Sequence, residues 1–425
     1  MTATTRRTPS PPKAPARPKA ATPPRGNHPL RQRVESPVTT YYVLLGTTAL
    51  LVVFGLVMVL SASTVTSMEA GASAYAAFRT QLGYAVAGLA IAAVASRVPV
   101  VWYRRLAVPT FAFALLLQLM VFSPLGVSVN GNRNWIRLGP VQIQPSEVLK
   151  IALVLVGALV LSRKRKMLSD VRHVVVPFLF PGVALALGLV LKGGDLGTTL
   201  VLVAVVAALL YAAGVPGRFF LGAAAVAALS VLALITSSGN RMGRVRAFLG
   251  GGCTSDAADS CYQSVHGLYA LADGGWWGVG LGASKEKWSW LPEAHNDYIF
   301  AIIGEELGLP GTLVVLGLFG LLAWACYRLV ARSSDHFVRL ASAGVMAWLL
   351  VQAMINIGVV IGLLPVIGLP LPLVSSGGSA LIMTLAALGM LLSFARAEPG
   401  ASEMLAARPS LVRAGLAVLP SRRHR

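Results

Sequence analysis

Long apolar runs separated by short polar segments dominate the chain. A helix that crosses a bilayer needs about 20 mainly apolar residues, and ten runs of this kind follow one another. They lie at about residues 42–62, 82–98, 107–123, 146–162, 173–191, 196–214, 217–236, 310–330, 340–363 and 377–395. The pattern predicts an all-α polytopic membrane protein with about ten transmembrane helices and a large extracytoplasmic loop, residues 237–309, between the seventh and the eighth.

The polar segments at the two ends define the domain organisation. Residues 1–38 are rich in Pro, Ala, Thr and basic residues, with Glu35 as their acid, so they cannot bury a core. We expect a disordered basic cytoplasmic tail at 1–38, a ten-helix membrane domain at 39–396 and a basic cytoplasmic tail at 397–425. With both termini in the cytoplasm, the inner segments hold most of the 36 Lys and Arg residues, as the positive-inside rule requires.

Composition excludes two broad classes of protein. Hydrophobic residues make up 56% of the chain and charged residues 12%, which is too little polar surface for a soluble globule of 425 residues. The net charge of +20 raises nucleic-acid binding as an alternative. However, the basic residues gather in tails and short loops and form no recognition element, so no nucleic-acid partner is expected.

The cysteines offer a disulfide candidate and no metal motif. Cys253 and Cys261 lie in the predicted outer loop, where thiols can oxidise, and a bridge over so short a loop would contribute roughly 2.5 kcal/mol. The alternative is two unpaired small residues. Glu293, His295 and Asp297 form too short a mixed triplet to predict a metal site, so none is predicted.

Acidic residues concentrate directly before the eighth apolar run. The stretch from Leu291 to Gly308 contains Glu293, Asp297, Glu305 and Glu306. An Asp at the bilayer centre costs roughly 2.5 to 3.5 kcal/mol, so carboxylates beside hydrocarbon usually line a wet cavity or a site. We therefore expect the reactive residues of the protein to lie in this stretch.

Two further clusters each have a structural and a functional interpretation. Glu147 and Lys150 are three residues apart on one helical face and can form an ion pair. Alternatively, Arg133, Arg137 and Lys150 present cations to an anionic substrate. Asp195 suits the N-cap of the sixth span.

The two remaining polar clusters are glycine-rich segments. The first, around Trp276 and Trp277 and continuing to Lys287, lacks a nucleotide-binding spacing and predicts a re-entrant or surface loop with interfacial tryptophans. The second, Ser375–Ser379, predicts either an anion-binding nest of backbone N–H groups or a broken helix in a cavity. Gln352 and Asn356 share one face of the ninth span and predict hydrogen bonds between helices.

Taken together, these motifs resemble the SEDS family of shape, elongation, division and sporulation proteins, typified by FtsW and RodA. The resemblance covers about residues 42–396. It rests on Gly131-x3-Trp135-Ile136, Gln144-Pro145-Ser146-Glu147-x2-Lys150, Asp195-Leu196-Gly197-Thr198, Gln263-Ser264, Gly280-Leu281-Gly282, Leu291-Pro292-Glu293-x-His295-x-Asp297, Gly304-Glu305-Glu306-Leu307-Gly308, Gly368-x-Pro370-Leu371-Pro372 and Ser375-x-Gly377-Gly378-Ser379.

The resemblance implies a peptidoglycan glycosyltransferase of the bacterial cytoplasmic membrane with ten transmembrane helices. Such proteins polymerise lipid II at the outer face of that membrane together with a class B penicillin-binding protein. The long basic N-terminal tail favours a division-type member, at the septum with other divisome membrane proteins, over an elongation-type one. A lipid II flippase and a purely structural scaffold are the alternatives from other classes.

The resemblance also assigns roles to residues. The family's proposed catalytic aspartate falls on Asp297, which we expect to act as general base on the acceptor hydroxyl. The leaving pyrophosphate needs cations, backbone donors or a divalent cation, Mg²⁺ or Mn²⁺. The candidate substrate-binding residues are Arg133, Glu147, Lys150, Asp195, Lys287, Glu293, His295, Ser375, Ser376, Gly377, Gly378 and Ser379.

Overall fold

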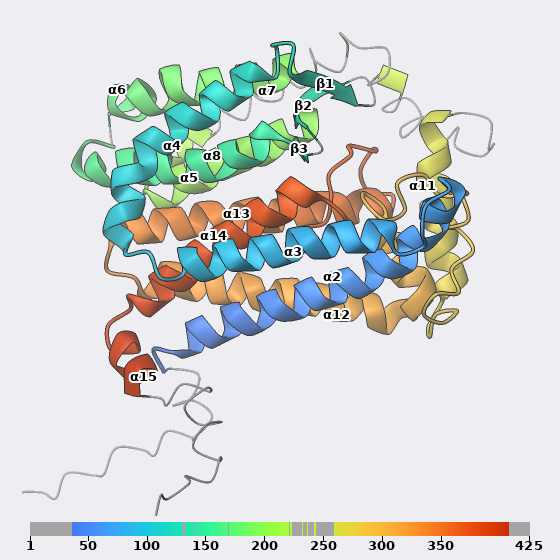
Figure 1. Cartoon of the computed structure of the whole chain (residues 1–425). Coiled ribbons are helices and arrows are strands. Elements are labelled where there is room, and N and C mark those ends of the chain that lie inside the picture. Colours follow the sequence, from blue (N-terminus) through green and yellow to red (C-terminus); the bar gives the residue numbers. More distant parts are fainter. Residues whose placement is uncertain are drawn as a thin grey trace, which may run out of the picture.

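A bundle of long apolar helices makes up most of the molecule (Figure 1). The computed structural model describes residues 36–129, 132–139, 141–168, 170–220 and 259–407, together with residues 222, 232, 236, 242 and 243. In this part of the chain, 7 helices are long and apolar enough to cross a membrane. They are α2 (Thr39–Glu69), α3 (Ala76–Ala95), α4 (Val100–Met120), α5 (Pro145–Arg163), α12 (Ile299–Arg332), α13 (His336–Val360) and α14 (Gly378–Arg396).

The shorter elements lie between these helices and at the ends of the bundle. They are α6 (Val171–Val174), the π-helical segment Val175–Val183, α7 (Ala184–Lys192), α8 (Leu196–Ala212), α11 (Asp259–Gly274), α15 (Ala401–Ala407), a single 3₁₀ turn (Arg165–Met167) and three strands, β1 (Gly126–Val129), β2 (Asn132–Leu138) and β3 (Val141–Ile143). The strands form an antiparallel sheet in the order β1-β2-β3, with Ile136 opposite both Gly126 and Ile143. The sheet and α11 lie at one end of the bundle, the loop end, and α15 lies at the other, the terminal end (Figure 1).

The predicted all-α polytopic fold is confirmed. Each predicted span except 217–236 overlaps a helix, and 217–236 lies largely outside the described residues. The predicted span 173–191 is irregular, because Val176 and Phe180 have non-helical dihedral angles and Pro181 interrupts the backbone hydrogen bonds. The small sheet and α11 were not predicted, since both fall within polar loops without an apolar run.

Several helices begin earlier than predicted, α3 at Ala76 and α4 at Val100 among them, and the start of α12 is the boundary that moves part of the acidic motif. Helix α12 begins at Ile299, well before the predicted start at 310, so Glu305 and Glu306 lie inside the helix and not in the outer loop. The helix is kinked at Gly308, whose φ of 64° breaks its regular geometry, just before Pro310. Gly308 and Pro310 interrupt the apolar pattern, but the helix continues beyond them.

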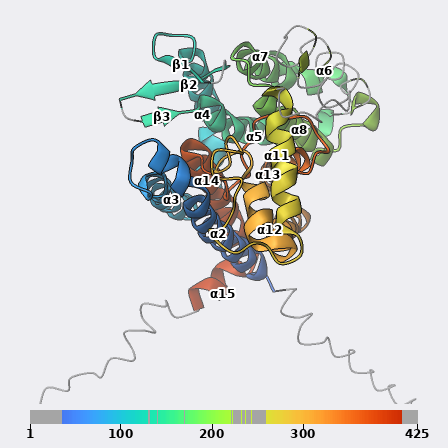
Figure 2. The same ribbon diagram turned by 90° about the vertical axis from the view of Figure 1, so that its right-hand side faces the viewer.

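Helices α5, α13 and α14 form the centre, and small residues allow their neighbours to approach closely (Figure 2). A Cβ built on Gly389 of α14 would lie 2.5 Å from the carbonyl oxygen of Ala92 on α3. Such contacts between backbones are typical of membrane helices, which associate through packing because lipid provides no hydrophobic drive between them.

Two hydrogen bonds between α2 and α12 mark the height of the bundle. At the terminal end Arg328 Nε donates to Thr40 Oγ1 at 3.0 Å, and towards the loop end Ser61 Oγ donates to Glu306 at 2.7 Å. The separation along each helix is about 32 Å at 1.5 Å per residue. This matches the hydrocarbon core of a bilayer, about 30 Å.

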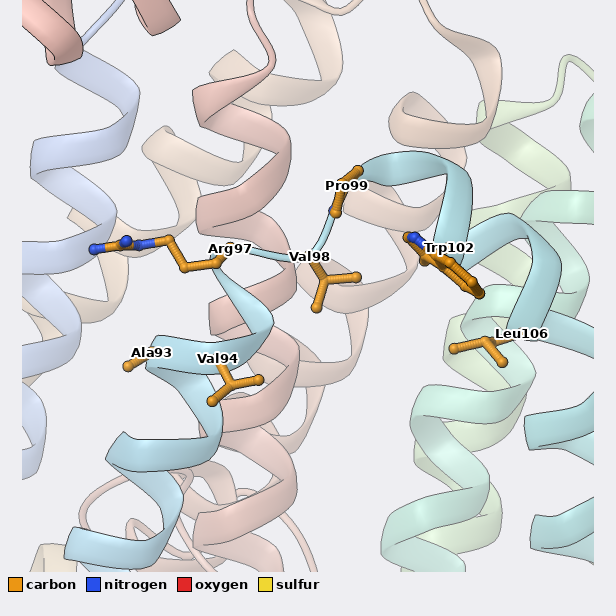
Figure 3. Close-up of a pocket in the computed structure, with 7 residues that line it drawn as sticks. All are labelled: Ala93, Val94, Arg97, Val98, Pro99, Trp102 and Leu106. Carbon is orange, nitrogen blue, oxygen red and sulfur yellow. The ribbon is translucent and has the colours of Figure 1, made fainter.

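A surface pocket of about 750 Å³ lies at the terminal end, at the turn between α3 and α4 (Figure 3). Val94, Val98, Trp102 and Leu106 line it, and the Arg97 side chain points away from Trp102. None of the predicted site residues contributes to this pocket.

Candidate functional site

The backbone around Asp297 is held by hydrogen bonds to the carbonyl groups of three successive residues. The Ser376 N–H donates to His295 O at 3.0 Å, and Ser375 Oγ donates to Asn296 O at 2.6 Å. The Asn356 side-chain amide donates to Asp297 O at 2.7 Å. We call these three contacts the Asp297 cradle. The acceptor in each contact is a main-chain oxygen, so the cradle positions the backbone of Asp297 and does not involve its carboxylate.

Helix α13 supports the cradle from one face. Asn356 also donates to Leu369 O at 2.7 Å, and Gln352, one turn away, donates to Pro370 O at 2.9 Å. Both amides are 2% exposed. The predicted hydrogen bond between helices is found for Gln352, which accepts from Lys150 of α5 at 3.0 Å, whereas Asn356 bonds to the loop carbonyls instead. These contacts fix the 368–377 segment against the Asp297 loop.

The Asp297 side chain lies at the edge of this assembly. It is half-buried and helps to line a small enclosed cavity together with Asn356, Val366 and Gly368. Its Oδ2 atom lies 3.4 Å from a Cβ built on Gly368, where φ is +78°, so a larger residue would be strained there and would crowd the carboxylate.

His295 and Glu293 flank the aspartate in the same loop. Burial lowers the pKa of His295, and the nearby Glu293 carboxylate opposes this effect only partly. His295 is therefore neutral near pH 7. Its Nδ1 atom is buried and makes no hydrogen bond within the described residues, whereas Glu293 is exposed.

Glu147 and Lys150 form the predicted ion pair, with Lys150 Nζ 2.9 Å from Glu147 Oε2. Lys150 also donates to Gln352 Oε1 at 3.0 Å and lies 4.7 Å from the centre of the Trp348 ring. The lysine is 1% exposed. These contacts support the structural interpretation over a cation that faces an incoming substrate, and through Gln352 they connect α5 to the cradle segment.

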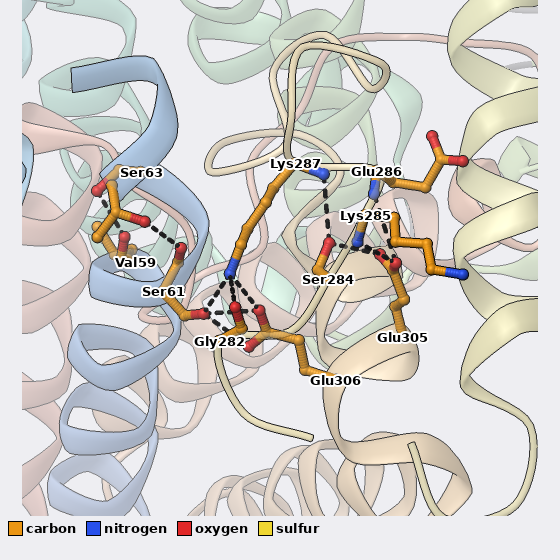
Figure 4. Close-up of polar contacts among 11 residues, drawn as sticks. Val59, Ser61, Ser63, Gly282, Ser284, Lys285, Glu286, Lys287, Glu305 and Glu306 are labelled. Atoms are coloured by element: carbon orange, nitrogen blue, oxygen red, sulfur yellow. Dashed lines mark hydrogen bonds and ion pairs between the residues drawn. The ribbon is translucent and has the colours of Figure 1, made fainter. Parts of the chain in front are cut away.

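A second buried cluster, which we call the carboxylate clamp, ties the loop before Asp297 to α12 and α2 (Figure 4). Glu306 pairs with Lys287 at 3.0 Å and accepts from Ser61 Oγ at 2.7 Å. Glu305 accepts from Ser284 Oγ at 2.5 Å and from the Lys285 N–H at 2.6 Å. Both carboxylates are at most 1% exposed.

The clamp changes the interpretation of Lys287. Its ammonium group is held by Glu306 and by Gly282 O at 2.6 Å, and the residue is 4% exposed. These contacts give Lys287 a structural role in the loop, and its role in substrate binding stays a prediction. Sequence reasoning missed Ser61, whose local signal is a small polar residue within an apolar run.

Asp195 and Arg133 lie in a separate region beside the sheet. Asp195 caps α8, as predicted: it accepts from the Thr198 N–H at 2.8 Å and from Gln144 Nε2 at 3.0 Å. Arg133 donates from its guanidinium to Ser123 O at 2.8 Å and from its backbone N–H to Gly193 O at 2.9 Å. Among the residues described, neither contacts the Asp297 cradle.

Of the two interpretations of Ser375–Ser379, the structure favours the broken helix over a nest of free N–H groups at Ser375–Gly377. The N–H groups of Ser375, Ser376 and Gly377 donate to Leu371 O, His295 O and Gln81 Oε1, at 3.0, 3.0 and 3.2 Å. Gly378 and Ser379 begin α14, where Ser379 Oγ accepts from the Gln144 N–H at 3.4 Å. Residues 375–377 therefore form a break before a helix, with their N–H groups bonded to neighbouring protein, as the alternative interpretation states.

Two other predictions, a disulfide and a divalent cation, remain untested. The Cys253–Cys261 bridge lies outside the described residues, because Cys253 and the Cys261 side chain are not among them. No three His, Cys, Asp or Glu side chains in the described ranges converge on a possible metal position. The divalent cation, Mg²⁺ or Mn²⁺, stays a prediction.

Replacing Asn356 with leucine is expected to loosen the cradle. The change removes the hydrogen bonds that Asn356 donates to the Asp297 and Leu369 carbonyls, and the loss of a partner costs about 1–3 kcal/mol for a buried group. We expect faster amide hydrogen exchange in peptides that cover residues 293–300. Met354→Leu, at a side chain 70% exposed on the same helix, is the control; equal exchange in both variants would show that Asn356 does not hold the loop.

Comparison with known proteins shows to which family the chain belongs. Residues 41–399 match the family described as cell cycle protein, FTSW_RODA_SPOVE. The chain is 42% identical over 372 residues to the probable peptidoglycan glycosyltransferase FtsW of Mycobacterium tuberculosis, covering 87% of this chain and 70% of the relative. It is 37% identical over 352 residues to the protein of the same name from Trichlorobacter lovleyi, covering 83% and 92%.

Two solved structures share the fold. One, described as "Structural coordination of polymerization and crosslinking by a peptidoglycan synthase complex", has a TM-score of 0.68 at 28% identity and covers 84% of this chain and 98% of that one. The other, the rod shape determining protein RodA of Thermus thermophilus, has a TM-score of 0.61 at 26% identity and covers 84% and 96%. This chain, as its motifs predict, belongs to the FtsW/RodA/SpoVE family of cell cycle proteins.

Proposed function

We propose that this protein is a peptidoglycan glycosyltransferase that polymerises lipid II. The observation that carries the proposal is an aspartate whose backbone is held by the cradle, in a chain whose relatives are named peptidoglycan glycosyltransferases. A backbone held by three hydrogen bonds suits a general base, which must be positioned within hydrogen-bond reach of the proton it removes.

In the proposed reaction Asp297 accepts the proton of a sugar hydroxyl as that oxygen attacks the anomeric carbon of a second lipid-linked sugar. A new glycosidic C–O bond forms, and the bond to the undecaprenyl pyrophosphate breaks, with its electron pair leaving on the pyrophosphate. Because the donor is already activated, the chain needs no nucleotide-binding fold. Glu147, Lys150 and Lys287 act in this proposal by holding the loops that surround the aspartate.

The location and partners belong to the same proposal. The loop end would face the outside of the bacterial cytoplasmic membrane, with both termini in the cytoplasm, consistent with the basic residues at the opposite end. Similarity to a peptidoglycan synthase complex supports a class B penicillin-binding protein as partner. The basic N-terminal tail and the relatives named FtsW favour a role at the division septum over elongation.

The test is polymerisation of labelled lipid II by the purified protein together with its cognate class B penicillin-binding protein. Glycan strands that appear with the complex and not with the transpeptidase alone are the expected result. Translocation of labelled lipid II across vesicles without polymer would instead identify a flippase. Activity should be assayed with the partner present, because an enzyme that a partner activates can be inert alone.

A further inference from the structure

A short loop carrying two tryptophans is attached to the outer part of α12. In this tryptophan loop, residues 275–282, the Val279 N–H donates to Glu305 O at 2.9 Å and the Gly280 N–H donates to Glu306 O at 3.0 Å. In return the Leu309 N–H donates to Gly275 O at 3.2 Å. A Cβ built on Gly308 would lie 2.7 Å from backbone atoms of the loop, so loop and helix are in direct backbone contact.

The side chains of the loop point outward although they are large and apolar. Trp276 is 74% exposed, Trp277 83% and Leu281 58%. Helix α12 presents Leu309, Leu313 and Leu316 at 40%, 54% and 44% exposure, spaced so that they share one face. The loop therefore extends an apolar surface of a membrane-spanning helix, and this surface is the one that lipid would cover.

The register of α12 gives the depth of the loop. Its attachment points, Glu305–Leu309, lie about 30 Å along the helix from Arg328, which contacts Thr40 at the terminal end. This is the thickness of the hydrocarbon core. The tryptophans consequently lie at the boundary between hydrocarbon and headgroups, where Trp is enriched because its ring is apolar and its N–H is polar.

We propose that the tryptophan loop is an interfacial anchor that binds the lipid surface through Trp276, Trp277 and Leu281. The anchor lies on the same loop as Ser284 and Lys287 of the carboxylate clamp, and the chain continues from there to Asp297. It therefore holds the aspartate at a set height relative to the headgroups. The positioning of Asp297 rests on the proposed function, since the pyrophosphate of a lipid-linked sugar lies at the height of the headgroups. The binding of the tryptophan loop to lipid does not depend on the proposed function.

Lipid quenching of tryptophan fluorescence tests the anchor directly. The full-length protein alone is placed in phosphatidylglycerol and phosphatidylcholine vesicles that contain lipid brominated near the headgroup end of the acyl chain. The signal of the two residues is the difference between wild type and the variant W276F/W277F, which keeps the apolar surface. We expect this difference signal to be quenched by the brominated lipid and to be shielded from aqueous acrylamide.

Two outcomes would overturn the proposal. Quenching by acrylamide without quenching by brominated lipid would place the loop in water. Shielding that appears only when the class B penicillin-binding protein is added would identify a protein-docking surface.

A second variant separates the anchor from the enzyme. W276S/W277S is expected to lose lipid II polymerisation in vesicles relative to W276F/W277F, with an unchanged melting temperature in detergent. Lipid quenching in a protein that forms no polymer even with its class B penicillin-binding protein present would leave the anchor intact and overturn only the proposed function. Equal polymerisation by the Ser and Phe variants in vesicles would overturn the coupling between the loop and Asp297.

Discussion

Replacing Asp297 with asparagine is expected to lower the rate of lipid II polymerisation by about 10²–10⁴-fold, the usual contribution of a positioned general base. Asparagine has nearly the same shape, and the three hydrogen bonds of the cradle accept at main-chain carbonyls, so they persist in the variant. What is lost is the ability to take a proton from the acceptor hydroxyl. The measurement is strand formation by the complex with its penicillin-binding protein at equal protein and lipid II concentrations.

A matched carboxylate outside the cradle provides the control. Asp273 is exposed on α11 at the same end of the bundle, and Asp273→Asn is expected to polymerise at the wild-type rate. Melting temperature and complex formation should be equal for all three proteins. Equal polymer from wild type and Asp297→Asn would remove Asp297 as the base while leaving its structural description unchanged.

Replacing Lys287 with methionine is expected to destabilise the protein by about 3–5 kcal/mol, because it leaves the Glu306 carboxylate buried without its counter-ion. The Glu306 side chain is shielded from water, so water cannot stabilise its charge. Among the described residues, Ser61 is the hydroxyl donor that would remain to the carboxylate. Methionine keeps the length and apolar stem of lysine, so lost charge and not lost volume dominates the effect. A lowered midpoint of thermal or denaturant unfolding in detergent measures it.

The double variant Lys287→Met/Glu306→Gln is the corresponding control. It removes both charges, so most of the lost stability should return, since replacing a whole buried pair is often close to neutral. If Lys287 were instead a substrate cation, the single variant would keep its stability and lose affinity for lipid II. Unchanged unfolding of Lys287→Met would therefore contradict the clamp.

Local patterns in the sequence determined several features without knowledge of the fold. Runs of apolar residues located the described membrane helices, since crossing hydrocarbon requires a continuous apolar length whatever the neighbours are. The spacing of Glu147 and Lys150 predicted their ion pair, and the position of Asp195 before α8 predicted its cap. Each of these depends on residues within one helical turn of one another.

Other features were decided only by how distant segments pack. The sequence marked Asp297 through a motif, but the donors of its cradle come from α13 and from the segment before α14. Likewise, the partner of Glu306 on α2 is Ser61, 245 positions away. Periodicity along the chain cannot identify such partners, because it describes which face of a helix is apolar and not which helix lies against it.

The same reason explains two positions at which the structure adds contacts that the sequence does not indicate. Ser375–Gly377 have the sequence of an open nest, and only the packing of Gln81 and His295 against them shows that their N–H groups are used. Lys287 reads as a free cation until α12 brings Glu306 beside it. The sequence by itself determined the membrane class, the family and the residues that carry charge. The tertiary structure decided which of those charges are neutralised inside the protein, because burying a charge is tolerated only where packing supplies its partner.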